Sequence, residues 1–210
     1  MSMEEPINAM DRPLALRWIS ALFARELTPE EVQSYRTGQG RVLVDELAAA
    51  FPDAEELEHI RTILDSPEPP LDAALDLAGA FSWLFHGVGG PKAVPPHQHD
   101  WSEMSDGTQM ECIDHCTKLM ARCGLGPSQE SGEPADHIST LLEFMGYLEQ
   151  QSTTDPEGPW NGYREELIRN HLSPWLPHFL TACERNDRSG LYAALAGLTR
   201  RILPDISLKQ

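Results

Sequence analysis

The sequence predicts an all-α fold, a single domain of about nine or ten helices, on three observations. Leu outnumbers Val by about five to one, which favours helices over strands. The alternation of apolar and polar residues that marks half-buried strands is missing, and apolar residues recur at three- and four-residue spacing instead. With 210 residues, the chain is long enough to bury a sizeable core without disulfides.

Five helices are expected in the first part of the chain. The first covers residues 12–26, where apolar residues follow one another at helical spacing. The second follows Thr28, the predicted N-cap of a capping box with Glu31, and has a proline at its first position. The third and fourth cover residues 40–51 and 54–65. The fifth, residues 69–85, is apolar on most faces, so we expect it to be central and buried.

A Gly- and Pro-rich segment without periodicity follows, and we expect a long loop over residues 87–107. Loops of this length inside a compact domain are unusual, and they often have a function or act as a hinge. The single domain, residues 1–210, could therefore consist of two halves, 1–86 and 108–210, joined by a hinge.

The second half resumes helical spacing after this loop. Pro134 suits the first position of a helix, because its missing N–H would have no partner there. Asp136 would then lie at the third position, where a carboxylate favours the positive end of the helix dipole. The expected helices cover residues 108–124, 134–148, 163–170, 171–184 and 189–203.

The chain is strongly acidic, with 33 Asp and Glu against 16 Lys and Arg, a net charge of −17 and a pI near 4.7. Nucleic-acid binding would need a basic surface, so we expect no nucleic-acid partner. A negative field attracts cations or basic peptides, although it also simply keeps a protein soluble.

Other features of the composition favour a cytoplasmic protein. No apolar run reaches the roughly 18 residues that a membrane span needs, so stable membrane insertion is not expected. The N-terminal residues lack the basic and apolar regions of a secretory signal. The four cysteines are too unevenly spaced to suggest a disulfide framework: Cys112, Cys116, Cys123 and Cys183.

Asp136 and His137 stand side by side just before an apolar run, and they have three readings. They could be an acid–base pair, half of a metal site, or polar residues at a helix start, with Asp136 bonding backbone N–H groups. An acid–base site needs a third group and a substrate pocket. The residues alone favour capping.

A metal site is the second candidate chemistry. Cys112 and Cys116 share a helix face close to His115, but structural zinc sites usually repeat tighter cysteine pairs. Buried cysteines that pack as small apolar residues are the better interpretation. The alternative function that remains is a small helical metal-dependent enzyme using His97, His99, Asp136 and His137.

The segment FSWLFHG, residues 81–87, is the third candidate. Its aromatic and leucine side chains suit a helical core, or an apolar groove for a partner segment at the mouth of the long loop. The sequence contains no phosphate loop, nucleophile elbow or HExxH motif, so no enzyme motif is present.

These segments also carry a family resemblance. FSWLFHG, VPPHQHDW, EPADHISTLLEFMGYL and HLSPWLPHFL resemble the marker segments of the TorD/DmsD family of redox-enzyme maturation chaperones. LFARE and TACERNDRSGLYAALAGLT are similar to the TorD branch. The resemblance covers residues 10–203. One departure stands after the proline pair, where this chain has His97-Gln98-His99-Asp100 in place of a short Ser/Tyr/aromatic stretch.

The resemblance implies an all-α, cytoplasmic chaperone with no catalytic step of its own. Members bind the twin-arginine signal peptide and the apoprotein of a molybdenum-cofactor reductase, of the trimethylamine N-oxide or dimethyl sulfoxide type. They hold the apoenzyme until its cofactor is inserted and so delay export. No cofactor is implied, apart from weak guanine-nucleotide binding in some members. Monomers or domain-swapped homodimers are implied.

The resemblance also implies which residues bind the leader peptide. Asp136 and Glu133 would pair with its arginines, and Leu84 and Phe85 would meet its apolar region. Negative charge would speed the encounter, and apolar burial would supply most of the affinity. The full set is Phe81, Leu84, Phe85, Gly87, Pro95, Pro96, Trp101, Glu133, Pro134, Asp136 and His137.

Overall fold

The computed structural model describes residues 11–101, 108–126 and 133–203, and these ranges contain ten α-helices and no strand. The predicted all-α fold and number of helices are therefore confirmed. Residues 102–107 of the predicted hinge and the N-terminal residues 1–10 lie outside the described part. The helices are α1 (Asp11–Ala24), α2 (Pro29–Thr37), α3 (Gln39–Ala50), α4 (Glu55–Leu64), α5 (Pro70–Phe85), α6 (Thr108–Arg122), α7 (Ile138–Thr154), α8 (Trp160–Leu167), α9 (Leu176–Asn186) and α10 (Leu191–Ile202).

The predicted capping box at the start of α2 is present. The Glu31 N–H donates to Thr28 Oγ1 at 3.2 Å, and the Thr28 N–H donates to Glu31 Oε2 at 2.9 Å. These two bonds satisfy backbone donors that a helix start otherwise leaves without partners.

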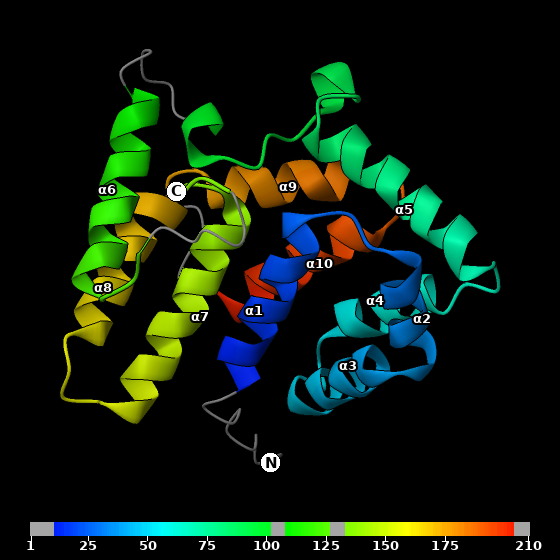
Figure 1. Cartoon of the computed structure of the whole chain (residues 1–210), viewed down its shortest axis with the longest axis horizontal. Helices are drawn as coiled ribbons and strands as arrows, with labels where there is room; N and C mark the ends of the chain where they lie inside the picture. Colours follow the sequence, from blue (N-terminus) through cyan, green and yellow to red (C-terminus); the bar gives the residue numbers. More distant parts are fainter. Residues whose placement is uncertain (1–10, 102–107, 127–132, 204–210) are drawn as a thin grey trace.

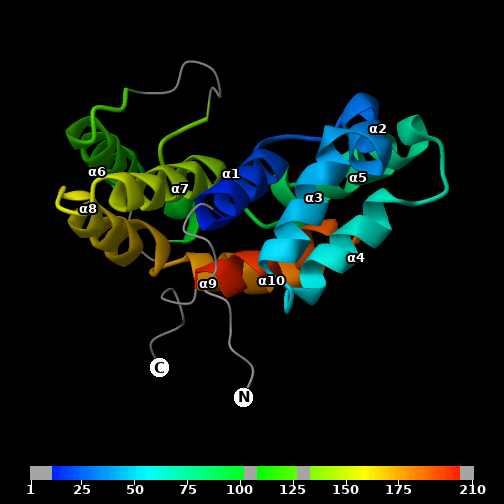
Figure 2. The same cartoon turned by 90° about the horizontal axis from the view of Figure 1, so that it is seen from below.

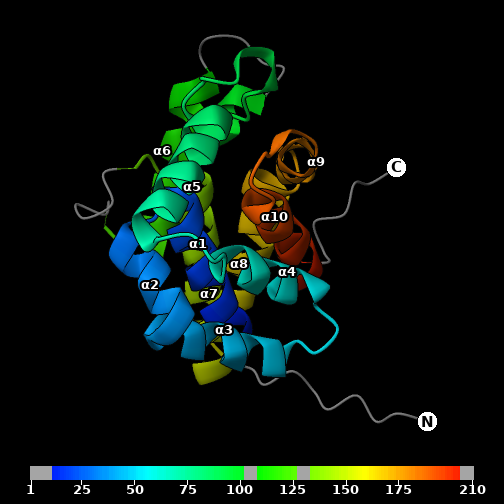
Figure 3. The same ribbon diagram turned by 90° about the vertical axis from the view of Figure 1, so that its right-hand side faces the viewer.

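The two halves of the sequence pack against each other mainly through the pairs α1–α7 and α4–α10, with a smaller contact between α1 and α10. Helix α1 runs along α7, and α10 packs on both α9 and α4 (Figure 1). The views turned by 90° show the same neighbours (Figure 2, Figure 3). Gly146 lets α1 and α7 approach closely, because a β-carbon there would lie 3.1 Å from the carbonyl oxygen of Pro13. The α1–α7 and α4–α10 interfaces each join an element before residue 86 to one after residue 107.

The core gathers aromatic rings from four helices around Phe23 of α1. Its ring lies 5.9 Å from Phe85, 5.6 Å from Phe179 and 6.3 Å from Tyr192, measured between ring centroids. All four side chains are buried. The pairs of Phe23 with Phe85 and Phe179 are edge-to-face, and pairs of this kind contribute on the order of 1 kcal/mol each beyond the burial of apolar area.

Helix α5 is not the central helix that its composition predicted. It packs mainly against α2 at one side of the molecule (Figure 3), so only one of its faces reaches the core. Leu71 and Leu75 are 57% and 61% exposed. The prediction was wrong because apolar composition on most faces does not fix how many neighbours a helix has.

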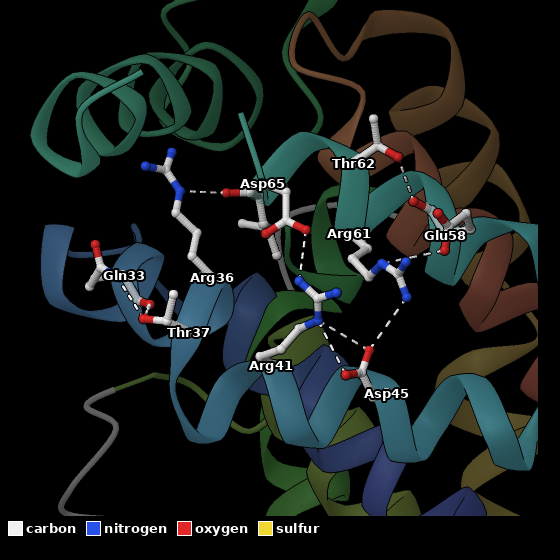
Figure 4. A network of polar contacts seen from close by, with 10 residues as sticks. Gln33, Arg36, Thr37, Arg41, Asp45, Glu58, Arg61, Thr62 and Asp65 are labelled. Carbon is white, nitrogen blue, oxygen red and sulfur yellow. Dashed lines mark hydrogen bonds and ion pairs between the residues drawn. The ribbon is translucent and has the colours of Figure 1, made fainter. Parts of the chain in front are cut away.

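Ion pairs on the surface connect α3 and the end of α4, and hydrogen bonds from Arg36 add α2 (Figure 4). Arg41 on α3 lies 3.2 Å from Asp45 Oδ2 and donates to Asp65 Oδ2 at 2.8 Å. Arg36 on α2 donates to the carbonyl oxygen of Leu64 at the end of α4, at 2.8 Å. Exposed ion pairs contribute at most about 1 kcal/mol each, so the apolar core carries most of the stability.

Three helices in the second half begin at residues clearly different from those predicted; one of them is α9, which begins at Leu176 and not at residue 171. Helix α8 begins at Trp160 and continues into a π-helical turn over Ile168–Leu172. Helix α7 begins at Ile138, four residues after the predicted start at Pro134. Within the described ranges, no helix has the length and apolar composition required to cross a membrane.

Candidate functional site

The described part of the predicted loop, residues 87–101, has local order. It contains two short 3-10 helices, Gly90–Lys92 and Gln98–Trp101. Between them, Val94 is buried, and its N–H donates to the carbonyl oxygen of Leu84 at 2.6 Å. Gly87 has a φ of +76°, a conformation that glycine adopts without strain. This loop therefore packs back onto the end of α5.

The loop next pairs with the segment just before α7. His97 and His137 form an isolated antiparallel β-bridge. The Gln98 N–H donates to the carbonyl oxygen of Asp136 at 3.0 Å, and the Ile138 N–H donates to that of Pro96 at 2.8 Å. The Pro-Pro and Asp-His segments, far apart in the sequence, are therefore held against each other by backbone hydrogen bonds.

His137, and not Asp136, caps α7. The Ser139 N–H donates to His137 Nδ1 at 3.2 Å, and the Ser139 hydroxyl lies 2.6 Å from the same nitrogen. His137 has extended backbone angles because it belongs to the β-bridge. The predicted helical positions of Pro134 and Asp136 are wrong for this reason.

Asp136 is completely buried and is hydrogen-bonded to His99 of the loop. Its Oδ2 lies 2.6 Å from His99 Nδ1 and accepts the His99 backbone N–H at 3.3 Å. Its Oδ1 has no hydrogen-bond partner among the described residues. A buried carboxylate needs a hydrogen-bond partner to offset the loss of hydration. His99 is that partner for Asp136.

The four residues proposed for a metal-dependent enzyme lie close together, with the rings of His97 and His99 5.3 Å apart, but among the described residues their ligand atoms do not form one metal-binding group. His99 and Asp136 bind each other, whereas the His137 ring faces His97, with ring centroids 5.0 Å apart. Burial, with a further contribution from His97, lowers the pKa of His137 to about 4. The ring of His137 is therefore neutral near pH 7. A ring nitrogen of each of His97 and His137 and a carboxylate oxygen of Glu133 lie within 4.8 Å of one another.

A second buried histidine was missed by the sequence analysis. His171 Nδ1 lies 2.9 Å from Gln98 Oε1, and its Nε2 lies 3.0 Å from His115 Nδ1. Gln98 in turn donates to the carbonyl oxygen of Asn170 at 3.0 Å. Burial, followed by the nearby His115, lowers the pKa of His171 to about 4. These bonds connect the loop to the π-helical turn and to α6.

The aromatic and leucine residues predicted for leader binding mostly face the core. Phe81 and Phe85 belong to the aromatic cluster, and Leu84 is 0% exposed. The half-buried Trp101 donates from Nε1 to the carbonyl oxygen of Pro95 at 2.8 Å. The ring of Trp101 also lies 6.4 Å from that of Trp175. Direct contact between a leader and Leu84 would require the core to open, so the structure favours a packing role for this residue.

The polar residues predicted for leader binding differ in their exposure. Glu133 and Pro134 are half-buried and reachable from solvent, whereas Asp136 and His137 are buried. An arginine could pair with Asp136 only if His99 moved away. Leader binding by the whole predicted set stays a prediction.

The cysteines match their interpretation as small apolar residues. All four thiols are free, and three of them are buried. The Cys116 thiol donates to the carbonyl oxygen of Ala135 at 3.2 Å, and burial raises its pKa to about 12. This thiol is therefore protonated at neutral pH and is a poor metal ligand.

An open groove lies outside the predicted set, between α4, α5 and the turn before α10. Its volume is about 600 Å³. The apolar part of its lining includes Leu77 and Ala80 of α5, and two acidic residues, Glu68 and Asp76, lie beside them. The exposed Leu71 and Leu75 of α5 do not line this groove, and apolar spacing in the sequence did not distinguish them from Leu77.

Comparisons of the sequence with known proteins identify a family and several relatives. A family profile described as nitrate reductase delta subunit matches residues 45–181. A chaperone protein TorD of Photobacterium profundum is 30% identical over 189 residues, which are 86% of this chain and 85% of the relative. The TorD chaperone of Aliivibrio salmonicida is 29% identical over 85% of this chain and 84% of the relative. That of Vibrio parahaemolyticus is 28% identical over 86% of both chains.

Proposed function

Because the chain belongs to the TorD/DmsD family of redox-enzyme maturation chaperones, we propose that it is a chaperone for the maturation of a molybdenum-cofactor reductase. The single observation that carries the proposal is similarity to TorD chaperones over most of both chains. In the finer proposal, the chain binds the twin-arginine leader and the apoprotein of a trimethylamine N-oxide or dimethyl sulfoxide reductase. It would act in the cytoplasm, before export. Weak guanine-nucleotide binding stays a prediction.

The charge of the chain supports the choice of a basic partner. A twin-arginine leader carries positive charge next to an apolar stretch, and this chain has a net charge of −17. The field of such a chain increases the rate of encounter with a basic peptide, most strongly at low salt. The apolar part of the leader would then supply the affinity through burial.

The groove beside α5 supports a specific place for the leader. Its floor contains the apolar Leu77 and Ala80, which could cover the leader's apolar stretch. Asp76 and Glu68 line the same groove, together with the basic Arg188, and could pair with arginines. This groove is open, although Leu77 and Ala80 on its floor are themselves largely buried. Leu84 lies deeper, with no exposed surface. We therefore place the leader along α5, with its basic end beside Asp76.

The paired loop and α7 segments would then position the groove. The bridge between His97 and His137 holds the segment that follows α5, and the Val94 N–H bonds to the carbonyl oxygen of Leu84. Because these contacts fix the end of α5, the segment Glu133–His137 would affect leader binding mainly by holding α5 and its groove in place. Glu133 is the carboxylate of that segment that a leader could reach directly.

Calorimetry with synthetic leaders tests the proposal. The leaders of the source cell's molybdoenzymes would be titrated into the chain, each beside a version with both arginines changed to lysine. We expect one leader to bind, and its lysine version to bind more weakly, because lysine lacks the bidentate geometry of arginine. Absence of binding for every leader, or equal binding of the lysine versions, would contradict the finer proposal.

A matched pair of variants tests the place of the leader. Asp76→Lys reverses a charge at the groove, and Glu46→Lys makes the same change in charge on the exposed surface of α3. We expect Asp76→Lys to weaken leader binding at least about tenfold, and Glu46→Lys to change it little. If both variants weaken leader binding equally, only the net charge of the chain matters, and the placement of the leader in the groove beside α5 is wrong.

A further inference from the structure

We propose that His97, Glu133 and His137 form a binding site for a divalent transition metal ion, such as zinc, that clamps the loop after α5 to the start of α7. The site lies beside the β-bridge, and its residues come from two segments that are distant in the sequence. It is separate from the proposed leader groove, so the two proposals can fail independently.

The geometry carries the proposal. One ligand atom from each of the three residues lies within 4.8 Å of the other two. His137 Nε2 is 3.9 Å from Glu133 Oε2, and the rings of His97 and His137 have centroids 5.0 Å apart. Small side-chain rotations would bring these atoms to the shorter separations that a shared metal ion requires. The bridge already fixes the backbones of both histidines.

The partner of His137 suits a metal ligand. If the metal binds Nε2, the ring proton must lie on Nδ1, and Nδ1 then needs an acceptor. The Ser139 hydroxyl oxygen lies 2.6 Å from Nδ1 and can accept a hydrogen bond from it. In that tautomer Nδ1 no longer accepts the Ser139 N–H, so metal binding replaces the cap bond seen in the structure. Ligating histidines commonly bond in this way through their second nitrogen, which fixes the orientation of the ring. Ser139 would therefore act as a positioning residue.

The donor set indicates the class of metal. Two imidazoles and one carboxylate suit zinc and its first-row neighbours, whereas calcium and magnesium prefer oxygen ligands alone. Because the start of α7 carries positive partial charge, it opposes a bound cation. The carboxylates of Glu133 and Asp100 offset this charge; Asp100 Oδ2 lies 3.6 Å from His97 Nδ1.

Zinc titration of the full chain, stripped of metal with a chelator, tests the proposal. We expect one equivalent of zinc to bind and to raise the thermal unfolding temperature, because the ion binds the folded state only. His97→Gln and Glu133→Gln should each weaken the binding at least about tenfold. Both residues are half-buried, so these variants should fold; His137 is buried and is a poorer choice.

His178→Gln is the matched control, because His178 is an exposed histidine outside the cluster. It should leave zinc affinity unchanged. A Cys112→Ser variant should also bind zinc normally, because the proposed site has no sulfur ligand. The proposal is overturned if the chain binds no zinc, if His97→Gln and Glu133→Gln keep full affinity, or if only the cysteine variant loses it.

Discussion

His99 Nδ1 lies 2.6 Å from Oδ2 of the fully buried Asp136. This contact joins the end of the loop after α5 to the residue before the cap of α7. It shows that Asp136, the second acidic residue of the segment Glu133–His137, holds two segments together instead of presenting a charge on the surface. A measurement of the free energy of unfolding therefore tests the role of Asp136.

Asp136→Asn should destabilise the chain by about 1–3 kcal/mol, because it removes the charge that pairs with His99 in a buried place. Asp45→Asn is the control, since Asp45 pairs with Arg41 on the exposed surface (Figure 4) and should cost less than about 1 kcal/mol. Denaturant unfolding of both variants measures the difference. Equal stability of the two would contradict a structural role for the buried pair.

The same pair bears on leader binding. If the carboxylate met the leader directly, as the family resemblance implies, Asp136→Asn would weaken leader binding by roughly 1–2 kcal/mol and shift the thermal unfolding temperature by only a few degrees. Because Asp136 is buried, we now expect any loss of affinity to accompany a loss of stability. Calorimetry and thermal unfolding of one preparation decide this. Weaker binding at normal stability would show that the carboxylate reaches the leader.

Gly146→Ala should destabilise the contact between α1 and α7. A β-carbon there would lie 3.1 Å from the Pro13 carbonyl oxygen, a backbone atom that cannot easily move. We expect a net loss of about 1–2 kcal/mol, even though alanine favours a helix over glycine. Gly79→Ala on α5 is the control, since its β-carbon would meet no atom within 4 Å and should stabilise by roughly 0.5–1 kcal/mol. A stabilising Gly146→Ala would contradict the close approach.

Stability should fall on acidification because of His171. The unfolded chain binds a proton there near pH 6.5, whereas the folded chain binds it only near pH 4. The contribution of His171 is therefore fully present above about pH 6.5 and is lost as the pH falls towards 4, by up to about 3 kcal/mol. His171→Gln should be less stable at pH 7 and should lose less stability on acidification. Unfolding curves at several pH values measure this, and parallel losses in both proteins would contradict it.

Raising salt from about 50 to 500 mM should slow leader association much more than it speeds dissociation. The reason is that exposed acidic groups steer a basic peptide over long range, and salt screens them. Stopped-flow measurements with a fluorescent leader separate the two rates. An association rate that does not change with salt would exclude steering by the −17 charge.

A slowly exchanging dimer should be isolable, with each subunit donating everything after about residue 107. The α1–α7 and α4–α10 interfaces both join the two halves, so a partner could supply the second helix of each pair unchanged. Light scattering after size-exclusion chromatography, followed by dilution, tests this prediction. Monomer alone at high concentration, or a dimer that dissociates quickly, would count against the hinge.

Local features of the fold could be predicted from the sequence. The capping box of Thr28 and Glu31 was predicted correctly, because all its contacts lie within three residues. The start of α7 was not, because the bridge to His97 holds His137 extended from a distant part of the chain. No local pattern carries that information.

The candidate site was only partly predictable for the same reason. Apolar spacing marks Leu84 and Leu75 alike, yet one is fully buried and the other largely exposed. The difference depends on which helices lie beside α5. His171 became notable only once the fold placed Gln98 and His115 against its two ring nitrogens.

Affinity capture from the source cell tests the central claim most directly. The tagged chain would be purified from cells that make molybdoenzymes, and the bound proteins would be identified by mass spectrometry, including their N-terminal peptides. We predict that the chain captures a molybdenum-cofactor reductase as a precursor that retains its twin-arginine leader. Capture of only mature, leader-free enzyme, or of no molybdoenzyme under conditions where the reductase is made, would contradict the proposed function.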